Sequence, residues 1–245
     1  MTEATETDKP RRAGRRTKAA TGDAAPSVTR ESIIAHALTI ARHESVDGIT
    51  IMRLSRELGV TPALIHYFTG GRDQLLSAVI NQAMASDNVR LTSKGDWLQD
   101  LEQLVRNTYA FQMKWKGITT YQHTNNKHRL FQDPKPGDKD LGLVFFNRFG
   151  IVLQSSGMAP ERAAMAFHLL MLFTTSIAIS HFNAQEPAAH QPFLKGRLQA
   201  LDADAYPGAH FMLGAFSRIS TAASFEEGLQ GLLATIASWA PAQPH

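Results

Sequence analysis

The residues near the start of the chain that could do chemistry are basic. Six of them lie within ten positions that contain no acidic residue: Lys9, Arg11, Arg12, Arg15, Arg16 and Lys18. Clustered lysines and arginines bind the phosphates of nucleic acids, and the spacing here shows no apolar face for a membrane surface. We therefore interpret residues 1–28 as a disordered arm that binds nucleic acid, with Arg11, Arg12, Arg15 and Arg16 as its contacts. A charged tail that only aids solubility is the alternative.

Other kinds of site have little support in the sequence. The absence of cysteine excludes disulfides, thiolate catalysis and cysteine-ligated metals. His123 and His128 have a spacing seen in some zinc sites, but no helix-borne acid accompanies them, so we expect no metal and no cofactor. The chain has no glycine-rich phosphate loop, nucleophile elbow or paired-carboxylate pattern, and we therefore do not expect an enzyme.

The segment after the arm shows three short helical patterns, at about 29–45, 50–59 and 61–68. Thr50 and Thr61 are residues that cap helices, and a proline follows Thr61, as is typical of a first helical position. A glycine separates the second pattern from the third. Two short helices joined in this way have the proportions of a helix-turn-helix, although a plain bundle of three short helices would show the same pattern.

The rest of the chain also shows helical periodicity and no strand pattern, so we predict an all-α fold. A long helix at 72–86 completes a head domain at 29–86, and a larger helical body follows at 87–245. The helix at 160–183 is apolar nearly all round, so we expect it to bury opposite faces. Its uncharged stretch approaches the length of a membrane span, but it stands alone among amphipathic helices. We expect no membrane partner and a cytoplasmic location.

The C-terminal part of the chain is predicted to contain an irregular segment and a last helix suited to dimerisation. The segment at 187–207 is rich in helix breakers, and we predict a loop with one short helix there. Ser224 and Glu227 form a capping-box pattern, so we predict that the last helix begins at Ser224 and runs to about Trp239. We expect the helices near 160–183 and 224–239 to build a homodimer interface.

The sequence TIMRLSRELGVTPALIHY at 50–67, followed by GRDQLL at 71–76, resembles the DNA-reading segment of TetR-family transcriptional regulators. It departs from the family at two positions. His66 stands where a tyrosine is usual, and Thr69 stands where a phenylalanine is usual. The closing segment FEEGLQGLL at 225–233 is similar to the last helix of one branch of the family, in which it implies dimerisation.

The resemblance implies eight DNA contacts: Thr50, Arg53, Thr61, Pro62, Ala63, His66, Tyr67 and Arg72. Thr50 and Arg72, which stands where the family usually has lysine, would hold phosphates with the help of helix N-termini. Thr61 to Ala63 would meet base edges and thymine methyl groups. Packing is the alternative role for Ala63, and a solvated helix face is the alternative for Arg53.

Formal charge within the head is balanced. From 29 to 90, six arginines are matched by Glu31, Glu44, Asp47, Glu57, Asp73 and Asp87. Because nonspecific DNA affinity comes mostly from cations on phosphates, we expect the basic arm to supply much of the electrostatic attraction, with the minor groove as a candidate position.

The body contains candidates for the small-molecule pocket that the resemblance implies: Trp115, Tyr121, Phe145, Phe149, Phe167, His168 and Met171. An aromatic stripe at helical spacing is also what an ordinary core shows. The function implied is that of a homodimeric repressor, released from a palindromic operator by a small-molecule effector. A nonspecific or architectural DNA-binding protein is the first alternative. An α-helical enzyme or carrier for an apolar ligand is the second, and it lacks a catalytic constellation.

Overall fold

The computed structural model describes residues 28–87, 95–125, 132, 134 and 137–241, and within these ranges the chain forms helices and no strand. The all-α prediction is confirmed. The α-helices are α1 (Arg30–Ala41), α2 (Ile51–Leu58), α3 (Pro62–Thr69), α4 (Arg72–Ser86), α5 (Trp97–Lys114), α6 (Lys116–Thr124), α7 (Leu141–Ser155), α8 (Pro160–Phe182), α9 (Gln191–Gln199), α10 (Pro207–Phe216) and α11 (Thr221–Ala237). Short 3-10 helices are present at Val46–Gly48 (η1) and Pro187–His190 (η2).

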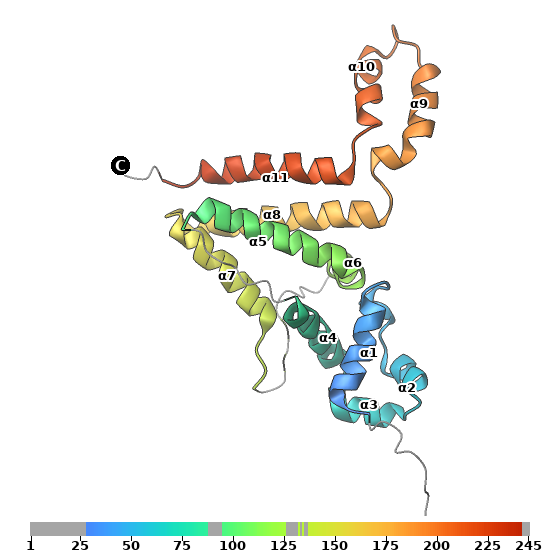
Figure 1. Ribbon diagram of the computed structural model, residues 1–245, viewed down its shortest axis with the longest axis vertical. Helices are drawn as coiled ribbons and strands as arrows, with labels where there is room; N and C mark the ends of the chain where they lie inside the picture. The colour runs from blue at the N-terminus through green and yellow to red at the C-terminus, as the bar shows by residue number, and fades with distance from the viewer. Residues whose placement is uncertain (1–27, 88–94, 126–131, 133, 135–136, 242–245) are drawn as a thin grey trace, which may run out of the picture.

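The head consists of α1 to α4 packed around one apolar core, and α4 lies on the side of the head toward the body (Figure 1). The apolar residues that recur along α1 and α4 are buried, and one anchor from each short helix joins them: Leu54 from α2 and Ile65 from α3 are both fully buried. Burying a side chain of this size stabilises a fold by roughly 1.5–3 kcal/mol. These anchors fix the two short helices and leave the opposite face of each, with Met52 and Arg56 on α2 and His66 and Tyr67 on α3, exposed to solvent.

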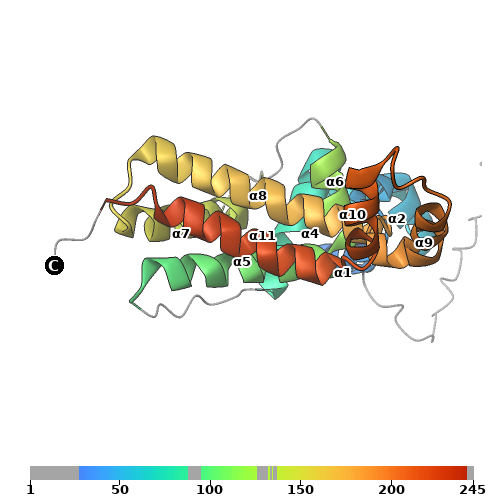
Figure 2. The same ribbon diagram turned by 90° about the horizontal axis from the view of Figure 1, so that it is seen from above.

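The body is a layer of long helices in which α5, α8 and α11 run side by side (Figure 2). Its core is separate from that of the head and is built by α5, α7, α8 and α11, with Leu101, Phe149, Leu170 and Leu229 among its fully or almost fully buried residues. The ring of Tyr109 stacks on that of Phe225, with centroids 4.0 Å apart. Arg106 lies beside this stack and pairs with both Glu102 and Glu226 at 2.8 Å.

The helix α6 fastens the body to the head. Trp115, just before α6, and Ile118 and Tyr121 within it are buried in the head's core. Gly117 lies so close to the end of α1 that a Cβ there would be 1.7 Å from the carbonyl oxygen of Glu44. Only glycine fits this approach. The core of the head thus continues into α6, beyond the predicted domain boundary between 29–86 and 87–245. That boundary stays a prediction.

A second connection joins α4 to the start of α7. The side-chain amide of Asn81 donates to the carbonyl oxygen of Lys139 at 2.9 Å and accepts from the backbone N–H of Leu141 at 2.8 Å. Arg30, at the start of α1, pairs with Asp138 in the same segment at 3.4 Å. The start of α7 is thus attached to both α4 and α1.

The hairpin of α9 and α10 was only partly predicted. Helix α9 is the one short helix expected at 187–207, but α10 was not predicted. The hairpin projects from the body between α8 and α11 (Figure 1), and neither α9 nor α10 has a buried residue. The predicted start of the last helix at Ser224 was wrong. The helix begins at Thr221 and is capped by Ser220, whose hydroxyl accepts from the N–H of Ala223 at 3.2 Å.

The apolar helix α8 is only partly buried within one chain. In the described part of the chain, the stretch Pro160–Gln199 is long and apolar enough to cross a membrane, and 22% of its most apolar window is buried. The core helix of a folded protein can meet the same length and composition criteria. Its buried residues, which include Ala166, Leu170 and Thr174, face the body core, whereas the other face carries the exposed residues Met165 and Leu172.

Candidate nucleic-acid interface

The helix-turn-helix is built by local signals that the sequence shows plainly. The hydroxyl of Thr50 accepts from the N–H of Arg53 at 3.1 Å and caps α2. Gly59 ends α2 with φ of 68°, a left-handed conformation that favours glycine. The hydroxyl of Thr61 accepts from the N–H of Leu64 at 3.3 Å, and Pro62 occupies the first position of α3. Both predicted caps are confirmed.

The exposed face of α3 carries every residue that was predicted to contact DNA from this helix: Thr61, Pro62, Ala63, His66 and Tyr67. Tyr67 has 78% of its surface exposed, and its ring meets that of Phe68 edge-on. Because Ala63 is exposed as well, it does not fill a packing role within the head. The third helix therefore presents one continuous surface of polar, aromatic and small side chains, as a recognition helix must.

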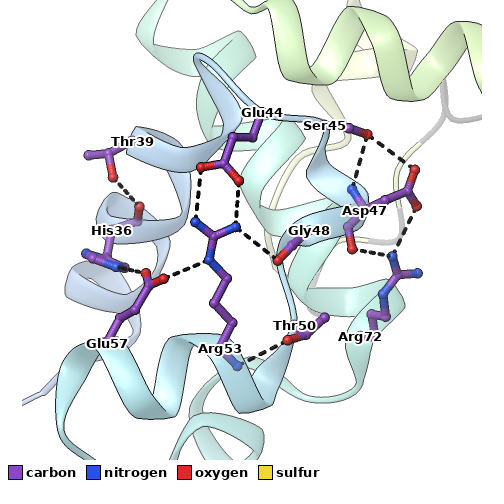
Figure 3. A network of polar contacts seen from close by, with 10 residues as sticks. All are labelled: His36, Thr39, Glu44, Ser45, Asp47, Gly48, Thr50, Arg53, Glu57 and Arg72. Atoms are coloured by element: carbon purple, nitrogen blue, oxygen red, sulfur yellow. Dashed lines mark hydrogen bonds and ion pairs between the residues drawn. The ribbon is translucent and has the colours of Figure 1, made fainter.

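Arg53 is placed differently from the other predicted contacts (Figure 3). Its guanidinium donates to both oxygens of Glu44, at 2.7 and 3.1 Å, and its Nε donates to Glu57 at 2.7 Å. His36 lies 2.7 Å from the second oxygen of Glu57. The network joins α1 to α2 and leaves 24% of the Arg53 side chain exposed. This geometry favours a positioning role for Arg53 over a direct phosphate contact.

Arg56, one turn further along α2, is a cation that the sequence analysis did not choose. It is exposed, and no ion pair to it is present within the described residues. Met52, 67% exposed, lies on the same short helix. The spacing of Arg53 and Glu57 suggests an ion pair within α2, but the second acid, Glu44, lies in the turn after α1 and is brought to Arg53 by the fold.

The Arg53 network predicts a dependence of stability on pH. The hydrogen bonds from Arg53 hold the pKa values of Glu44 and Glu57 below the ordinary value of 4.5. A lowered carboxyl pKa stabilises the fold above the unfolded-state pKa, and this contribution is lost as pH falls through the folded-state values. We expect Arg53→Gln to lower the free energy of unfolding at pH 7 and to have a smaller effect near pH 3, as measured by urea denaturation. Arg56→Gln is the control, and an Arg53→Gln effect that is equal at both pH values would contradict the prediction.

Arg72 begins α4 at the edge of the head, and 44% of its side chain is exposed. Its guanidinium donates to the carboxylate of Asp47 at 3.2 Å and to the carbonyl oxygen of the same residue at 3.3 Å (Figure 3). The arginine therefore lies where the sequence predicted it, at a helix N-terminus, but it is paired with an acid within the head. The arm residues Arg11, Arg12, Arg15 and Arg16 lie outside the described residues.

The seven residues predicted to line a ligand pocket do not gather at one place. Trp115 and Tyr121 are buried in the head's core, and His168 is exposed on α8. The other four belong to the body core: Phe145 and Phe149 on α7, and Phe167 and Met171 on α8. The rings of Phe145 and Phe149 lie 5.0 Å apart, and Phe149 lies 5.3 Å from Phe167.

Three amide side chains on α5 that were not predicted as site residues have buried polar atoms with no hydrogen-bond partner among the described residues: Gln103 Oε1, Asn107 Nδ2 and Gln112 Oε1. The other end of the Gln112 amide donates to the hydroxyl of Thr175 on α8 at 2.9 Å. Buried polar atoms of this kind need a partner, so they are candidates for ligand contacts. A cavity of about 420 Å³ lies elsewhere, between α1, α4 and the segment before α7, with Arg30, Asn81 and Lys139 in its lining.

Comparisons with known proteins fit this architecture. No family model matches the chain. The repressor DrrR1 of Streptomyces coeruleorubidus is 27% identical over 86 residues, which are 35% of this chain and 32% of that protein. The regulator BetI of Brucella anthropi is 37% identical over 59 residues, 24% of this chain and 30% of that protein. The chain thus spans about a third of the length of these helix-turn-helix regulators.

Solved structures match over most of the chain. Apo ActR of Streptomyces coelicolor has a TM-score of 0.71 and 24% identity, covering 89% of this chain and 98% of that one. ActR in complex with (S)-DNPA has a TM-score of 0.69 and 25% identity, covering 88% and 99%. A TetR variant of Acinetobacter baumannii in complex with minocycline has a TM-score of 0.56 and 16% identity, covering 88% and 100%. The resemblance predicted from the helix-turn-helix is therefore confirmed: the chain has the all-α fold of TetR-family transcriptional regulators.

Proposed function

We propose that the protein is a homodimeric transcriptional regulator that represses from a palindromic operator and is released by a small-molecule effector. One observation carries the proposal: the buried anchors Leu54 and Ile65 hold α3 so that its predicted reading face, from Thr61 to Tyr67, is exposed. Phosphate contacts from Thr50 and Arg72 would fix the register on the duplex, and α3 would read base edges in the major groove.

The proposed dimer uses α8 and α11, as the sequence suggested. The outer face of α8 leaves Met165 and Leu172 exposed, and α11 runs beside it. The adjoining hairpin adds large apolar side chains, among them Phe193 at 68% and Phe211 at 86% exposure. A second copy on this face would bury both sets. A two-fold dimer would place its two α3 helices in successive turns of the major groove, about 34–36 Å apart or a multiple of that distance.

The proposed effector binds in the body. ActR has been solved with (S)-DNPA and with actinorhodin, and TetR with minocycline, which supports a small-molecule effector here. The ring cluster of Phe145, Phe149 and Phe167 suits an aromatic ligand, and the unpaired amides of α5 suit its polar groups. Neither feature suggests catalysis, so we propose no enzymatic activity. Because a regulator of this kind must reach the chromosomal DNA of a bacterium, we propose a cytoplasmic location for the protein.

The function is tested by selecting bound fragments from a random DNA library with the purified full-length protein near physiological salt. Enrichment of an inverted repeat is the expected result and would support a dimeric, sequence-specific regulator. Recovery of DNA without enrichment would favour the architectural alternative, and recovery of none would favour a ligand carrier. The effector is tested by reciprocity, because a ligand that lowers operator affinity must itself bind more weakly in the presence of operator.

The basic arm gives a separate prediction. Deleting residues 1–20 should flatten the plot of log affinity for DNA against log salt, because each lost phosphate contact reduces the slope by about 0.9. The acidic residues of the head balance its arginines, so the arm is the main source of uncompensated cations in this half of the chain. Deletion of residues 1–8, which contain no lysine or arginine, is the control. An unchanged slope after the longer deletion would remove the arm from the DNA interface.

A further inference from the structure

Asp47 connects the proposed DNA contact Arg72 to the body. One carboxylate oxygen of Asp47 accepts from Arg72 at 3.2 Å. The other accepts from the hydroxyl of Ser45 at 3.2 Å and from the side-chain amide of Asn125 at 3.1 Å. Asn125 follows the last residue of α6 and also donates to the carbonyl oxygen of Tyr121 at 3.2 Å. Asn125, Asp47 and Arg72 therefore form a chain of contacts from the end of α6, through η1, to the start of α4.

The turn that carries Asp47 does not depend on its carboxylate. The backbone N–H of Gly48 donates to the carbonyl of Ser45 at 3.0 Å, and that of Ile49 donates to Val46 at 3.0 Å. Val46 and Ile49 are both fully buried and anchor the turn in the head's core. The carboxylate of Asp47 is thus available for a role other than holding η1 together.

The ion pair of Asp47 with Arg72 is well placed to exchange for a DNA phosphate. Both side chains are about half exposed, at 48% and 44%, and exposed ion pairs are weak and easily separated. A phosphate oxygen that meets the guanidinium would compete with the same acid. Asp47 must then be displaced, or it stays beside the phosphate and repels it.

We propose that Asp47 weakens the binding of Arg72 to a DNA phosphate, and that Asn125 holds the carboxylate of Asp47 beside Arg72. The inference rests on the proposed DNA-binding function. Helix α6 packs against α8 of the body as well as against α1 and η1. A local movement of the C-terminal end of α6, which Asn125 follows, displaces Asn125, releases Asp47 and changes the availability of Arg72. The body thereby acts on a phosphate contact of the head through two side chains.

The experiment measures the affinity of the full-length protein for a random-sequence DNA duplex and for its selected operator across a salt series. Asp47→Asn should raise affinity about threefold or more and steepen the salt slope by about 0.9 per head. The same substitution in an Arg72→Gln background should bring no gain, because the cation it releases is absent. Asp96→Asn at the start of α5, in the body, makes the same charge change outside the head and keeps the helix cap, so it should leave the affinity unaltered.

Asn125→Ala tests the connection to α6. It should reproduce part of the gain seen in Asp47→Asn and add nothing to it when the two are combined. Thr124→Ala is the matched control, because among the described residues the Thr124 hydroxyl bonds within α6, to the carbonyl of Thr120 at 2.9 Å. A gain from Asp47→Asn that persists without Arg72 would overturn the role of Asp47. An Asn125→Ala protein with wild-type affinity would overturn the role of Asn125.

The failure of this inference can be told apart from failure of the proposed function. Wild-type protein that binds operator, with an Asp47→Asn variant of equal affinity and slope, contradicts the inference alone. Wild-type protein that binds neither DNA probe contradicts the proposed function itself. A melting temperature recorded for each variant identifies any loss of fold.

Discussion

Replacing Gly117 by alanine is expected to lower the melting temperature of the full-length protein more than any surface substitution in the head. The added Cβ would lie 1.7 Å from the carbonyl oxygen of Glu44 and 2.5 Å from that of Ala41. These are backbone atoms at the end of α1, so they cannot move aside as the end of a flexible side chain does. Overpacking typically costs about 1–3 kcal/mol, and a collision with backbone belongs at the top of this range. A loss of about 3 kcal/mol corresponds to a fall of about 6–12 °C in a chain of this size.

The matched control is Gly150→Ala in α7. Outside the adjacent residues and the backbone of α7 itself, no atom of the described residues lies within 4 Å of a Cβ at this position, and alanine is the better helix former by about 0.5–1 kcal/mol. We therefore expect an unchanged or slightly higher melting temperature for Gly150→Ala in the same calorimetric scan. If Gly117→Ala melted with the wild type, the contact of α6 with α1 would not be as close as the structure has it.

The helix-turn-helix could be predicted from the sequence because its signals are local. Thr50, Gly59 and the pair Thr61-Pro62 each act on backbone groups within four residues. Both partners of each interaction therefore lie in the same short stretch of sequence. Side chains such as Ile65 then follow from helical spacing alone. The all-α fold class and the exposed face of α3 can both be predicted from these caps and from the helical spacing of apolar residues.

The C-terminal hairpin could not be predicted in the same way. Helix α10 buries no residue in the described chain, so the amphipathic contrast that reveals a helix packed on a core is absent from it. The start of α11 is set partly from a distance, because the N–H of Thr221 donates to the carboxylate of Glu186 at 2.8 Å. Ser224 with Glu227 satisfied a local capping rule, but this tertiary contact and the cap from Ser220 extend the helix by one turn.

The roles of the charged residues depend on contacts that cross between elements. The pair of Arg53 with Glu57 is four residues apart on one helix, and sequence spacing could suggest it. His36 reaches the same network from α1 and Glu44 from the turn after it, and Asn125 reaches Asp47 from 78 residues away. No spacing rule anticipates such partners, which is why Arg53 was assigned to DNA and the Asp47 contacts were not noticed.

The division between head and body illustrates the same limit. Trp115 and Tyr121 are aromatic residues of the predicted body, and this made them candidates for the ligand pocket that the family resemblance implies. Gly117 lets α6 approach the end of α1, and this approach carries both rings into the head's core. The glycine was visible in the sequence, but its meaning depended on knowing which backbone would lie against it.

Replacing Tyr67 by alanine should lower affinity for the selected operator about 10- to 100-fold while leaving the fold intact. Tyr67 is 78% exposed on α3, so its truncation removes little packing, and surface substitutions of this kind change stability by about 0.5 kcal/mol or less. At the DNA interface, one side-chain contact contributes about 0.7–1.4 kcal/mol, and a dimer loses the contact in both half-sites, which gives the 10- to 100-fold loss. Fluorescence anisotropy with operator and with random-sequence DNA measures the two affinities, and thermal denaturation measures stability.

The control for Tyr67→Ala is Ile151→Ala, which truncates a 57% exposed apolar side chain on α7, away from the head. It should change neither affinity. Tyr67→Phe separates the hydroxyl from the ring: a loss equal to that of alanine would assign the contact to the hydroxyl, whereas full activity would assign it to the ring. If Tyr67→Ala binds operator like the wild type, α3 does not read DNA through the face that its buried anchors leave exposed, and the sequence-specific proposal loses its main support. Equal losses on operator and random-sequence DNA would instead make Tyr67 a backbone contact and leave specificity to Thr61, Pro62 and Ala63.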